Sequence, residues 1–262
     1  MADHTTYGLV CSELSEDLSK TNLGELELDS FQKNSVKIKI KAASLNFPDL
    51  LMTQGKYQNK PNLPFALGME GAGIVEKIGS EVSSLKEGDE VMFGGWGHGA
   101  IAESIILPEG LVSLKPKSLN FSEAASFKTA YLTAYVGLIR RGELRQGETL
   151  LVHGASGGVG MAAVQMGKLY GARVIASGTS DEKLKIVKTW GADEIINTGL
   201  EGSVSFREEV KHLTDGKGAD VIYDPVGGDV FDESIRCINW GGRLLIIGFT
   251  SGRIPTVPVN YP

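Results

Sequence analysis

The sequence predicts an α/β protein in which a mainly β domain, residues 1–125, precedes a doubly wound parallel sheet over residues 126–262. Three observations lead to this prediction. The first part holds short strand-like segments at close spacing, which is typical of a mainly β unit. The second part alternates short apolar strands with helices, which is typical of βαβ units. A glycine-rich turn, Ala155–Gly160, joins the first of these later strands to a helix.

Composition and charge limit the class of protein. Among 262 residues, 42% are hydrophobic and 22% are charged, as in soluble globular proteins. The net charge of -6 argues against a nucleic-acid or anionic-membrane surface, and no apolar run is long enough to span a bilayer. Residues 1–4 lack the features of a secretory signal, and Cys11 and Cys237 match no metal or redox spacing. We therefore expect a cytoplasmic protein with reduced thiols.

The β domain begins with short strand-like pieces and then a clear strand. Val36–Ala42 alternates apolar and charged residues, which predicts a strand with one solvated face. A long loop-rich segment, residues 44–69, follows it. Further strands are expected after turns within Gly68–Gly79, Glu87–Met92 and Ile101–Leu107.

The second domain begins with a helix that carries Phe127–Arg141, and Ser122 is expected to cap it. Strands and helices then alternate without an internal repeat. The predicted strands are Thr149–His153, Arg173–Ser177, Glu194–Asn197, Val221–Asp224 and Arg243–Gly248. The predicted helices are Gly160–Tyr170, Asp181–Trp190, Val204–Thr214 and Val230–Asn239.

The turn Ala155-x-Gly157-x-x-Gly160 resembles a dinucleotide fingerprint with alanine at its first position. Gly157 and Gly158 would let the backbone approach a pyrophosphate, and Gly160 would let the helix pack close to the strand. The free N–H groups at the helix start would then face the anion. The alternative is an ordinary strand-to-helix turn, and the βαβ context disfavours it.

The end of the second parallel strand indicates which nicotinamide cofactor fits. An NAD-specific fold places an acidic residue there to bind the adenosine ribose, but this sequence has Gly178. Small hydroxyl residues, including Ser180, follow, and Lys183 lies one turn into the next helix. These residues leave room and positive charge for a 2′-phosphate, which favours NADPH. Asp181 and Glu182 oppose it, and a solvated helix lysine is the alternative for Lys183.

The ordered motifs resemble one enzyme family. Val152–Gly160, Leu132–Tyr135 and Asp224–Gly228 look like the quinone oxidoreductase (zeta-crystallin-like) branch of the medium-chain dehydrogenase/reductases. The first domain carries the family's motifs in order, at Leu45–Asp49, Gly55–Tyr57, Pro64–Gly73 and Lys86–Val91. The resemblance implies a GroES-like β domain followed by a Rossmann domain, with the active site in the cleft between them.

The same resemblance assigns cofactor contacts residue by residue. It places Asn46 near the nicotinamide ribose and Thr133 near the nicotinamide or the phosphates. The nicotinamide would be framed by Val226, Gly248 and Phe249. Gly157, Gly158 and Val159 line the pyrophosphate, and Lys183 meets the 2′-phosphate. Many relatives have a tyrosine where Thr198 follows Asn197, so that further phosphate contact is not expected here.

The zinc-dependent members of the superfamily differ from this chain at their metal ligands. Ser44–Phe47 has no cysteine, and the Gly-His-Glu position reads Gly68-Met69-Glu70. Two cysteines cannot supply the four-cysteine structural lobe. Because zinc prefers three or four N or S ligands, which this sequence does not offer, we expect a zinc-independent enzyme.

The chemistry expected is NADPH-dependent hydride transfer to a small quinone or α,β-unsaturated carbonyl. Tyr57 is the candidate for binding the carbonyl or relaying a proton, although a packed tyrosine is the alternative. His98 and His153 are further candidate proton donors, and a structural role is favoured for His153.

Two other functions stay open. An enoyl reductase acting on a thioester is one, although no lysine or arginine cluster for a coenzyme A phosphate is evident. A silent NADPH-binding or structural protein is the other. It is suggested by a predicted sheet that has fewer strands than the six of a full Rossmann sheet, as if truncated at its C-terminus. A homodimer also stays open, because in this family the pairing strand lies beyond residue 262.

Overall fold

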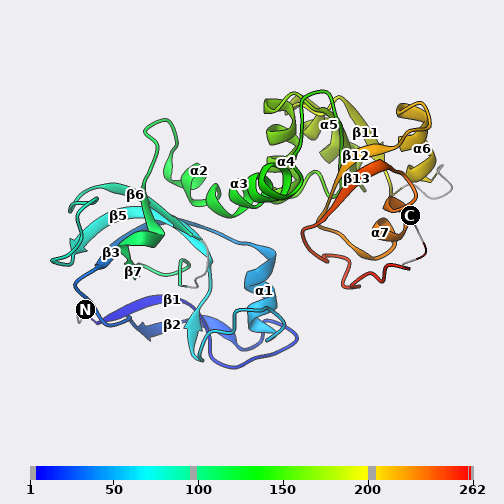
Figure 1. Ribbon diagram of the computed structural model, residues 1–262. Coiled ribbons are helices and arrows are strands. Elements are labelled where there is room, and N and C mark those ends of the chain that lie inside the picture. Colours follow the sequence, from blue (N-terminus) through cyan, green and yellow to red (C-terminus); the bar gives the residue numbers. More distant parts are fainter. Residues whose placement is uncertain (1–3, 95–98, 200–204, 259, 261–262) are drawn as a thin grey trace. The chain divides into compact units, whose positions relative to one another are not determined.

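The two halves of the chain contain different kinds of β-sheet. The computed structural model describes residues 4–94, 99–199, 205–258 and 260. The chain divides into two units, Met1–Thr129 and Ala130–Pro262. The first holds antiparallel sheets and the second a parallel one (Figure 1), so the predicted α/β class is confirmed.

The first unit is built from two antiparallel sheets. A three-stranded sheet has the order β2-β1-β4, and a five-stranded sheet has the order β7-β3-β5-β6-β8. The predicted strand at Val36–Ala42 is the centre of β3, which pairs with both β5 and β7. Its apolar residues Val36 and Ile38 are fully buried. The strands are β1 Thr5–Cys11, β2 Thr21–Glu27, β3 Ser35–Ser44, β4 Phe65–Ala66, β5 Glu70–Ile78, β6 Glu90–Gly94, β7 Ser104–Pro108 and β8 Val112–Leu114, with a short 3₁₀ helix at Glu109–Leu111.

A helix, α1 Phe47–Thr53, lies within the segment that was expected to be loop. Its start is stabilised locally, because Asp49 Oδ2 accepts the backbone N–H of Asn46 at 2.7 Å. Pro48 occupies its first turn, where proline lacks only an N–H that would be unpaired anyway. The Asn-x-x-Asp spacing was the available signal for this helix.

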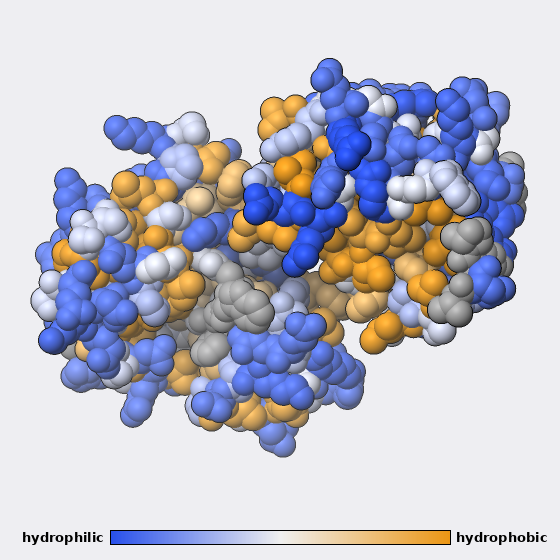
Figure 2. All heavy atoms as spheres, viewed as in Figure 1, coloured by the Kyte–Doolittle hydropathy of each residue, from blue (hydrophilic) through white to orange (hydrophobic). Residues whose placement is uncertain are grey.

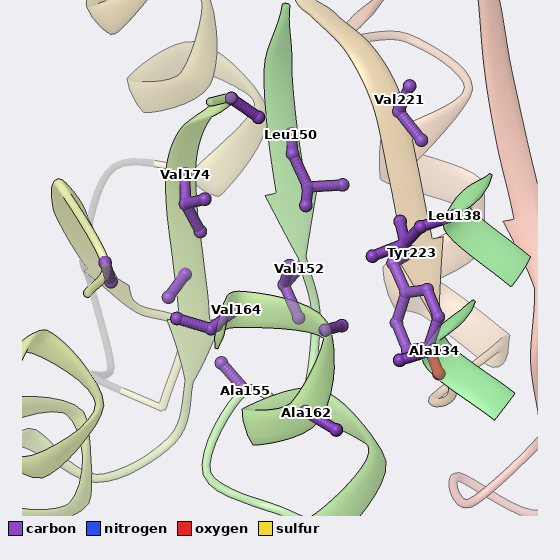
Figure 3. Close-up of a cluster of buried hydrophobic side chains, with 14 of the residues drawn as sticks. Ala134, Leu138, Leu150, Val152, Ala155, Ala162, Val164, Val174, Val221 and Tyr223 are labelled. Carbon is purple, nitrogen blue, oxygen red and sulfur yellow. The ribbon is translucent and has the colours of Figure 1, made fainter. Parts of the chain in front are cut away.

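The second unit is a five-stranded parallel sheet with the order β11-β10-β9-β12-β13. Its strands are β9 Thr149–Val152, β10 Arg173–Gly178, β11 Glu194–Asn197, β12 Ala219–Asp224 and β13 Ile238–Ile246. Successive strand residues point to opposite faces, so both faces need apolar cover. One face contributes Leu150, Val152, Val174 and Tyr223 to a core shared with α4 (Figure 3). The other contributes Leu151, Ile175 and Ile222 to a core shared with α6.

The helices of both units follow the predicted order, with two corrections. They are α2 Phe121–Ala125, α3 Lys128–Ala134, a π-helical stretch Tyr135–Arg141, α4 Gly158–Leu169, α5 Asp181–Thr189, α6 Phe206–Leu213 and α7 Gly228–Ser234. The Ser122 cap was wrong: Asn120 caps α2, because its Oδ1 accepts the Glu123 N–H at 2.9 Å. The helix predicted to reach Asn239 ends at Ser234, because the chain from Ile238 pairs with β12 instead.

The surface in view in Figure 2 is largely hydrophilic, with separate apolar areas. Within the described ranges, no helix is long and apolar enough to cross a membrane.

Candidate functional site

The parallel sheet changes winding direction between β9 and β12. The chain leaves β9 through α4 to reach β10 on one side, whereas β12 pairs with β9 on the other side. Ligands of open α/β sheets bind at such a switch point, outside the carboxyl ends of the strands. The loops that follow β9, β10, β12 and β13 all lie at this edge.

The glycine-rich turn after β9 packs tightly against the start of α4. Gly154 has φ +55°, a left-handed conformation that favours glycine. A Cβ on Gly160 would lie 2.3 Å from the Gly154 carbonyl oxygen and 2.8 Å from Ala155 Cα. Only glycine therefore allows this approach of helix to strand, as the sequence predicted for Gly160.

The next part of the turn is open and presents hydrogen-bond donors. A Cβ on Gly158 would meet nothing within 4 Å, and one on Gly157 would meet only the Gly154 oxygen, at 3.3 Å. Gly157 is the N-cap residue of α4, and as a glycine it offers the helix no side-chain acceptor. In the described chain, the N–H groups of Gly158, Val159 and Gly160 have no acceptor. Unpaired donors and the positive end of the helix dipole suit an anion such as a diphosphate.

A second group of candidate residues lies where β10 leads into α5. Gly178 ends β10, and Ser180 caps α5 by accepting the Lys183 N–H at 3.4 Å. The negative charge of Asp181 was expected to oppose phosphate binding. Its Oδ1 accepts a hydrogen bond from Asn197 Nδ2 at 2.6 Å. Lys183 is exposed, and its ammonium group forms no ion pair with any described residue. A positive charge is therefore available to a ligand here.

The loops after β12 and β13 are held together by Asp224. Its Oδ1 accepts the N–H groups of Val226 at 2.8 Å and Gly227 at 3.0 Å. Its carbonyl oxygen accepts the N–H groups of Ile247 at 2.9 Å and Gly248 at 3.4 Å. Asp224 thus orders the two loops that carry Val226, Gly248 and Phe249. The sequence placed Asp224 at a strand end and in a family motif but predicted no role for it, although an acid directly after a buried apolar run was a signal.

Burial dominates the electrostatics of Asp224. The residue is 1% exposed, and Oδ2 is buried without a hydrogen-bond partner in the described structure. Burial raises the pKa of this carboxyl group, against the lowering effect of the Gly227 and Val226 N–H groups.

In the first unit, Asn46 is joined to a buried acid. Asn46 Nδ2 donates to Glu70 Oε1 at 3.0 Å, and the Thr129 N–H donates to Glu70 Oε2 at 2.8 Å. Glu70 is 1% exposed. Nearby, Asp49 accepts the Gly68 N–H at 3.1 Å, so it braces the loop at both ends. Burial raises the pKa of Asp49, and the Glu70 charge raises it further.

Tyr57 and Thr133 are less buried. The Tyr57 ring packs against a buried cluster that includes Met52, Phe65 and Leu67, which matches the packed alternative for this residue. No described residue forms a hydrogen bond with its hydroxyl group. Thr133 is half-buried on α3.

His153 is a structural residue in this fold. Its Nδ1 lies 2.7 Å from Ser177 Oγ and its Nε2 lies 2.8 Å from Ser234 Oγ. Because Ser234 Oγ donates to the Val230 carbonyl at 2.6 Å, it accepts from His153 Nε2–H, and Nδ1 accepts from Ser177. Burial lowers the pKa of His153 to about 3. The ring is therefore neutral and fully bonded. His98, the other candidate donor, lies outside the described residues.

The structure thus brings most of the candidate cofactor residues to one edge of one sheet. These residues lie at or after the carboxyl ends of parallel strands: Gly157, Gly158, Val159, Gly178, Ser180, Lys183, Val226, Gly248 and Phe249. Asn46 and Tyr57 belong to the first unit. Across the described ranges, no group of three or more His, Cys, Asp or Glu residues could hold a metal ion.

Comparison with known proteins covers both units. An alcohol dehydrogenase GroES-like domain family matches residues 32–117, and a zinc-binding dehydrogenase family matches residues 158–261. The quinone oxidoreductase-like protein 2 homolog of Nematostella vectensis is 39% identical over 253 residues, which cover 96% of this chain and 68% of that protein.

Two solved structures are similar over most of the chain. The Escherichia coli quinone oxidoreductase complexed with NADPH has a TM-score of 0.87 and 30% identity, covering 97% of this chain and 76% of that one. The CurK enoyl reductase has a TM-score of 0.83 and 31% identity, covering 94% of this chain and 76% of that one.

Proposed function

The chain belongs to the quinone oxidoreductase (zeta-crystallin-like) branch of the medium-chain dehydrogenase/reductase superfamily, and from this premise we propose that it is a zinc-independent, NADPH-dependent oxidoreductase. The acceptor of the hydride is a quinone or an α,β-unsaturated carbonyl. Bound NADPH supplies the hydride, and the protein supplies position and electrostatics. The similar Escherichia coli quinone oxidoreductase, which was solved with NADPH, supports this cofactor.

One observation carries the proposal. The turn after β9 combines an open glycine surface with unpaired N–H donors at the switch point of a parallel sheet. An apolar ligand would leave those donors unpaired, at a cost of about 1–3 kcal/mol for each buried group. A diphosphate would accept from all of them. Gly157, Gly158 and Val159 are therefore assigned to the diphosphate.

Lys183 and Ser180 are assigned to the 2′-phosphate. Lys183 offers an ammonium group that forms no ion pair with the described residues, and Gly178 leaves no acid at the strand end. Asp181 is bonded to Asn197, which holds its carboxyl group to β11. A charge-assisted hydrogen bond contributes about 1.5–3 kcal/mol, which corresponds to roughly a tenfold to hundredfold preference for NADPH.

Tyr57 is assigned to the acceptor. When hydride adds to the acceptor, its carbonyl oxygen gains negative charge and needs a hydrogen-bond donor. The Tyr57 hydroxyl group is such a donor, because its ring is fixed by packing while its oxygen forms no hydrogen bond with the described residues. Asn46 is assigned to the nicotinamide ribose, and Thr133 to the nicotinamide or the phosphates. The nicotinamide itself is assigned to Val226, Gly248 and Phe249.

The donor set supports zinc independence. The positions that bind catalytic zinc in related dehydrogenases offer Ser44–Phe47 without a cysteine and Met69 in place of histidine. A thioether and a hydroxyl group are poor substitutes for the thiolate and imidazole ligands of zinc. Activity should therefore survive prolonged treatment with a chelator.

A second acceptor class is supported by one comparison. The CurK enoyl reductase is as similar in sequence as the quinone oxidoreductase structure. The reductant and the cofactor residues would be the same, and only the acceptor pocket would differ. We therefore test both acceptors together.

The test is NADPH oxidation by the purified chain with 1,4-naphthoquinone and, separately, with crotonyl-coenzyme A. We expect turnover with the quinone, and Tyr57→Phe should lower kcat about a hundredfold. Tyr7→Phe is the matched control, since Tyr7 is an exposed tyrosine of the same unit. Turnover with crotonyl-coenzyme A alone would favour the enoyl reductase. NADPH binding without turnover of either acceptor would favour a silent binding protein.

A further inference from the structure

A fully buried acid links two segments of the first unit. Glu70 is the first residue of β5 and is 1% exposed. Its two oxygens accept different donors: Oε1 takes Asn46 Nδ2 at 3.0 Å, and Oε2 takes the Thr129 N–H at 2.8 Å. These donors lie 24 residues before and 59 residues after it in the sequence. A buried acid survives only with such partners.

The contact fixes the orientation of the Asn46 amide. An amide has a donor end and an acceptor end that differ little in shape. Glu70 Oε1 is bonded to the Asn46 side chain while Oε2 is bonded to Thr129, so the carboxyl group acts as an acceptor on both sides. The end that faces Glu70 must therefore be Nδ2. This orientation of the amide also fixes the directions of the second N–H group of Nδ2 and of Oδ1.

We propose that Glu70 is a positioning residue, which holds the Asn46 amide in the one orientation that presents its remaining N–H to the cofactor. The inference rests on the proposed function, because it takes Asn46 as a cofactor contact. Glu70 itself touches no ligand. It acts by removing the alternative, flipped state of the amide, which would present an acceptor where a donor is needed.

Glu70→Gln separates this role from a purely structural one. The new amide at position 70 keeps an acceptor for the Thr129 N–H and turns a donor toward Asn46. Asn46 can then satisfy it by flipping and presenting Oδ1. Because the Thr129 N–H and the Asn46 amide both keep a hydrogen-bond partner, the chain should stay folded, with a thermal midpoint close to that of the wild type. The Asn46 amide, however, should be held in the wrong orientation.

The experiment measures the dissociation constant of NADPH and the thermal midpoint for the wild type, Glu70→Gln, Asn46→Ala and the double variant. We expect about a tenfold weaker NADPH affinity in each single variant. The double variant should lose no more than Asn46→Ala alone, because Glu70 acts only through Asn46. Glu76→Gln is the matched control, an exposed glutamate of the same strand that should bind NADPH as the wild type does.

A second measurement does not depend on whether the Glu70→Gln variant folds. In ¹⁵N-labelled wild-type protein, the Asn46 side-chain amide is identified as the pair lost in Asn46→Ala. One of its protons should exchange slowly with solvent, and the other should shift on addition of NADPH. Two rapidly exchanging protons would overturn the inference.

The outcomes distinguish this inference from the proposed function. A Glu70→Gln variant that binds NADPH within twofold of the wild type overturns the inference alone. So does a further tenfold loss in the Asn46→Ala background, since that effect would bypass Asn46. A wild-type chain that does not bind NADPH overturns the proposed function, and the inference with it.

Discussion

Two glycines that lie two residues apart should respond in opposite ways to the same added methyl group. Gly160→Ala adds a Cβ that would lie 2.3 Å from the Gly154 oxygen, about 1.1 Å short of the 3.4 Å at which ordinary contact begins. The atoms it meets are backbone, so α4 must move away from the turn. Gly158→Ala adds a Cβ that meets nothing within 4 Å.

The magnitudes follow from these contacts. Overpacking of this kind costs about 1–3 kcal/mol, which corresponds to a thermal midpoint lower by roughly 2–4 °C for each kcal/mol. Gly158→Ala should be neutral or stabilise the helix by up to about 1 kcal/mol, because alanine loses less entropy than glycine. It should nevertheless weaken NADPH binding at least about tenfold, or about 1.4 kcal/mol, since the methyl group occupies the open surface.

The assay pairs thermal unfolding without ligand with NADPH titration for both variants. We expect a less stable Gly160→Ala and a stable but weakly binding Gly158→Ala. Wild-type NADPH affinity in Gly158→Ala would refute the placement of the diphosphate on this turn. An unchanged thermal midpoint in Gly160→Ala would refute the packing argument.

Three further predictions follow from single contacts. Lys183→Ala should weaken NADPH binding about tenfold and leave NADH binding unchanged, whereas Lys185→Ala on the same helix should change neither; an equal loss for both cofactors would contradict the phosphate assignment. The His153 pKa of about 3, against 6.5 for an ordinary histidine, means that the unfolded chain binds the extra proton. Relative to His153→Gln, the wild type should therefore lose about 1.4 kcal/mol of stability per pH unit as pH falls from 6.5 toward 3 in urea titrations, and parallel pH profiles would contradict this. Asp224→Ala should lower the free energy of unfolding by about 2–3 kcal/mol, because two backbone N–H groups lose their acceptor; a change below about 0.5 kcal/mol would show that the Asp224 side chain does not hold the loop after β12.

The parallel sheet could be predicted because its signal is local. Each strand is a short apolar run, and adjacent residues such as Leu150 and Leu151 are buried on opposite faces. The helix α1 was missed because it is short and its only signals are Pro48 and one capping contact. The local sequence pattern also predicted a helix N-cap at Ser122, whereas the N-cap residue is Asn120.

The glycine turn could be named from its spacing in the sequence, and Val226, Gly248 and Phe249 from the resemblance to the family. Glu70 and Asp224 could not be assigned roles in the same way. Glu70 acts on partners 24 and 59 residues away, and Asp224 joins two loops that only the sheet brings together. Such contacts depend on tertiary structure, which spacing does not encode.

The central claim is that the carboxyl edge of the parallel sheet binds NADPH. The most direct test is a titration of the purified chain with NADPH and then NADH, followed by nicotinamide fluorescence. The structure predicts NADPH binding at least about tenfold tighter than NADH binding, from the charge-assisted contact at Lys183. Equal affinities would contradict the 2′-phosphate assignment, and binding of neither cofactor would contradict the central claim itself.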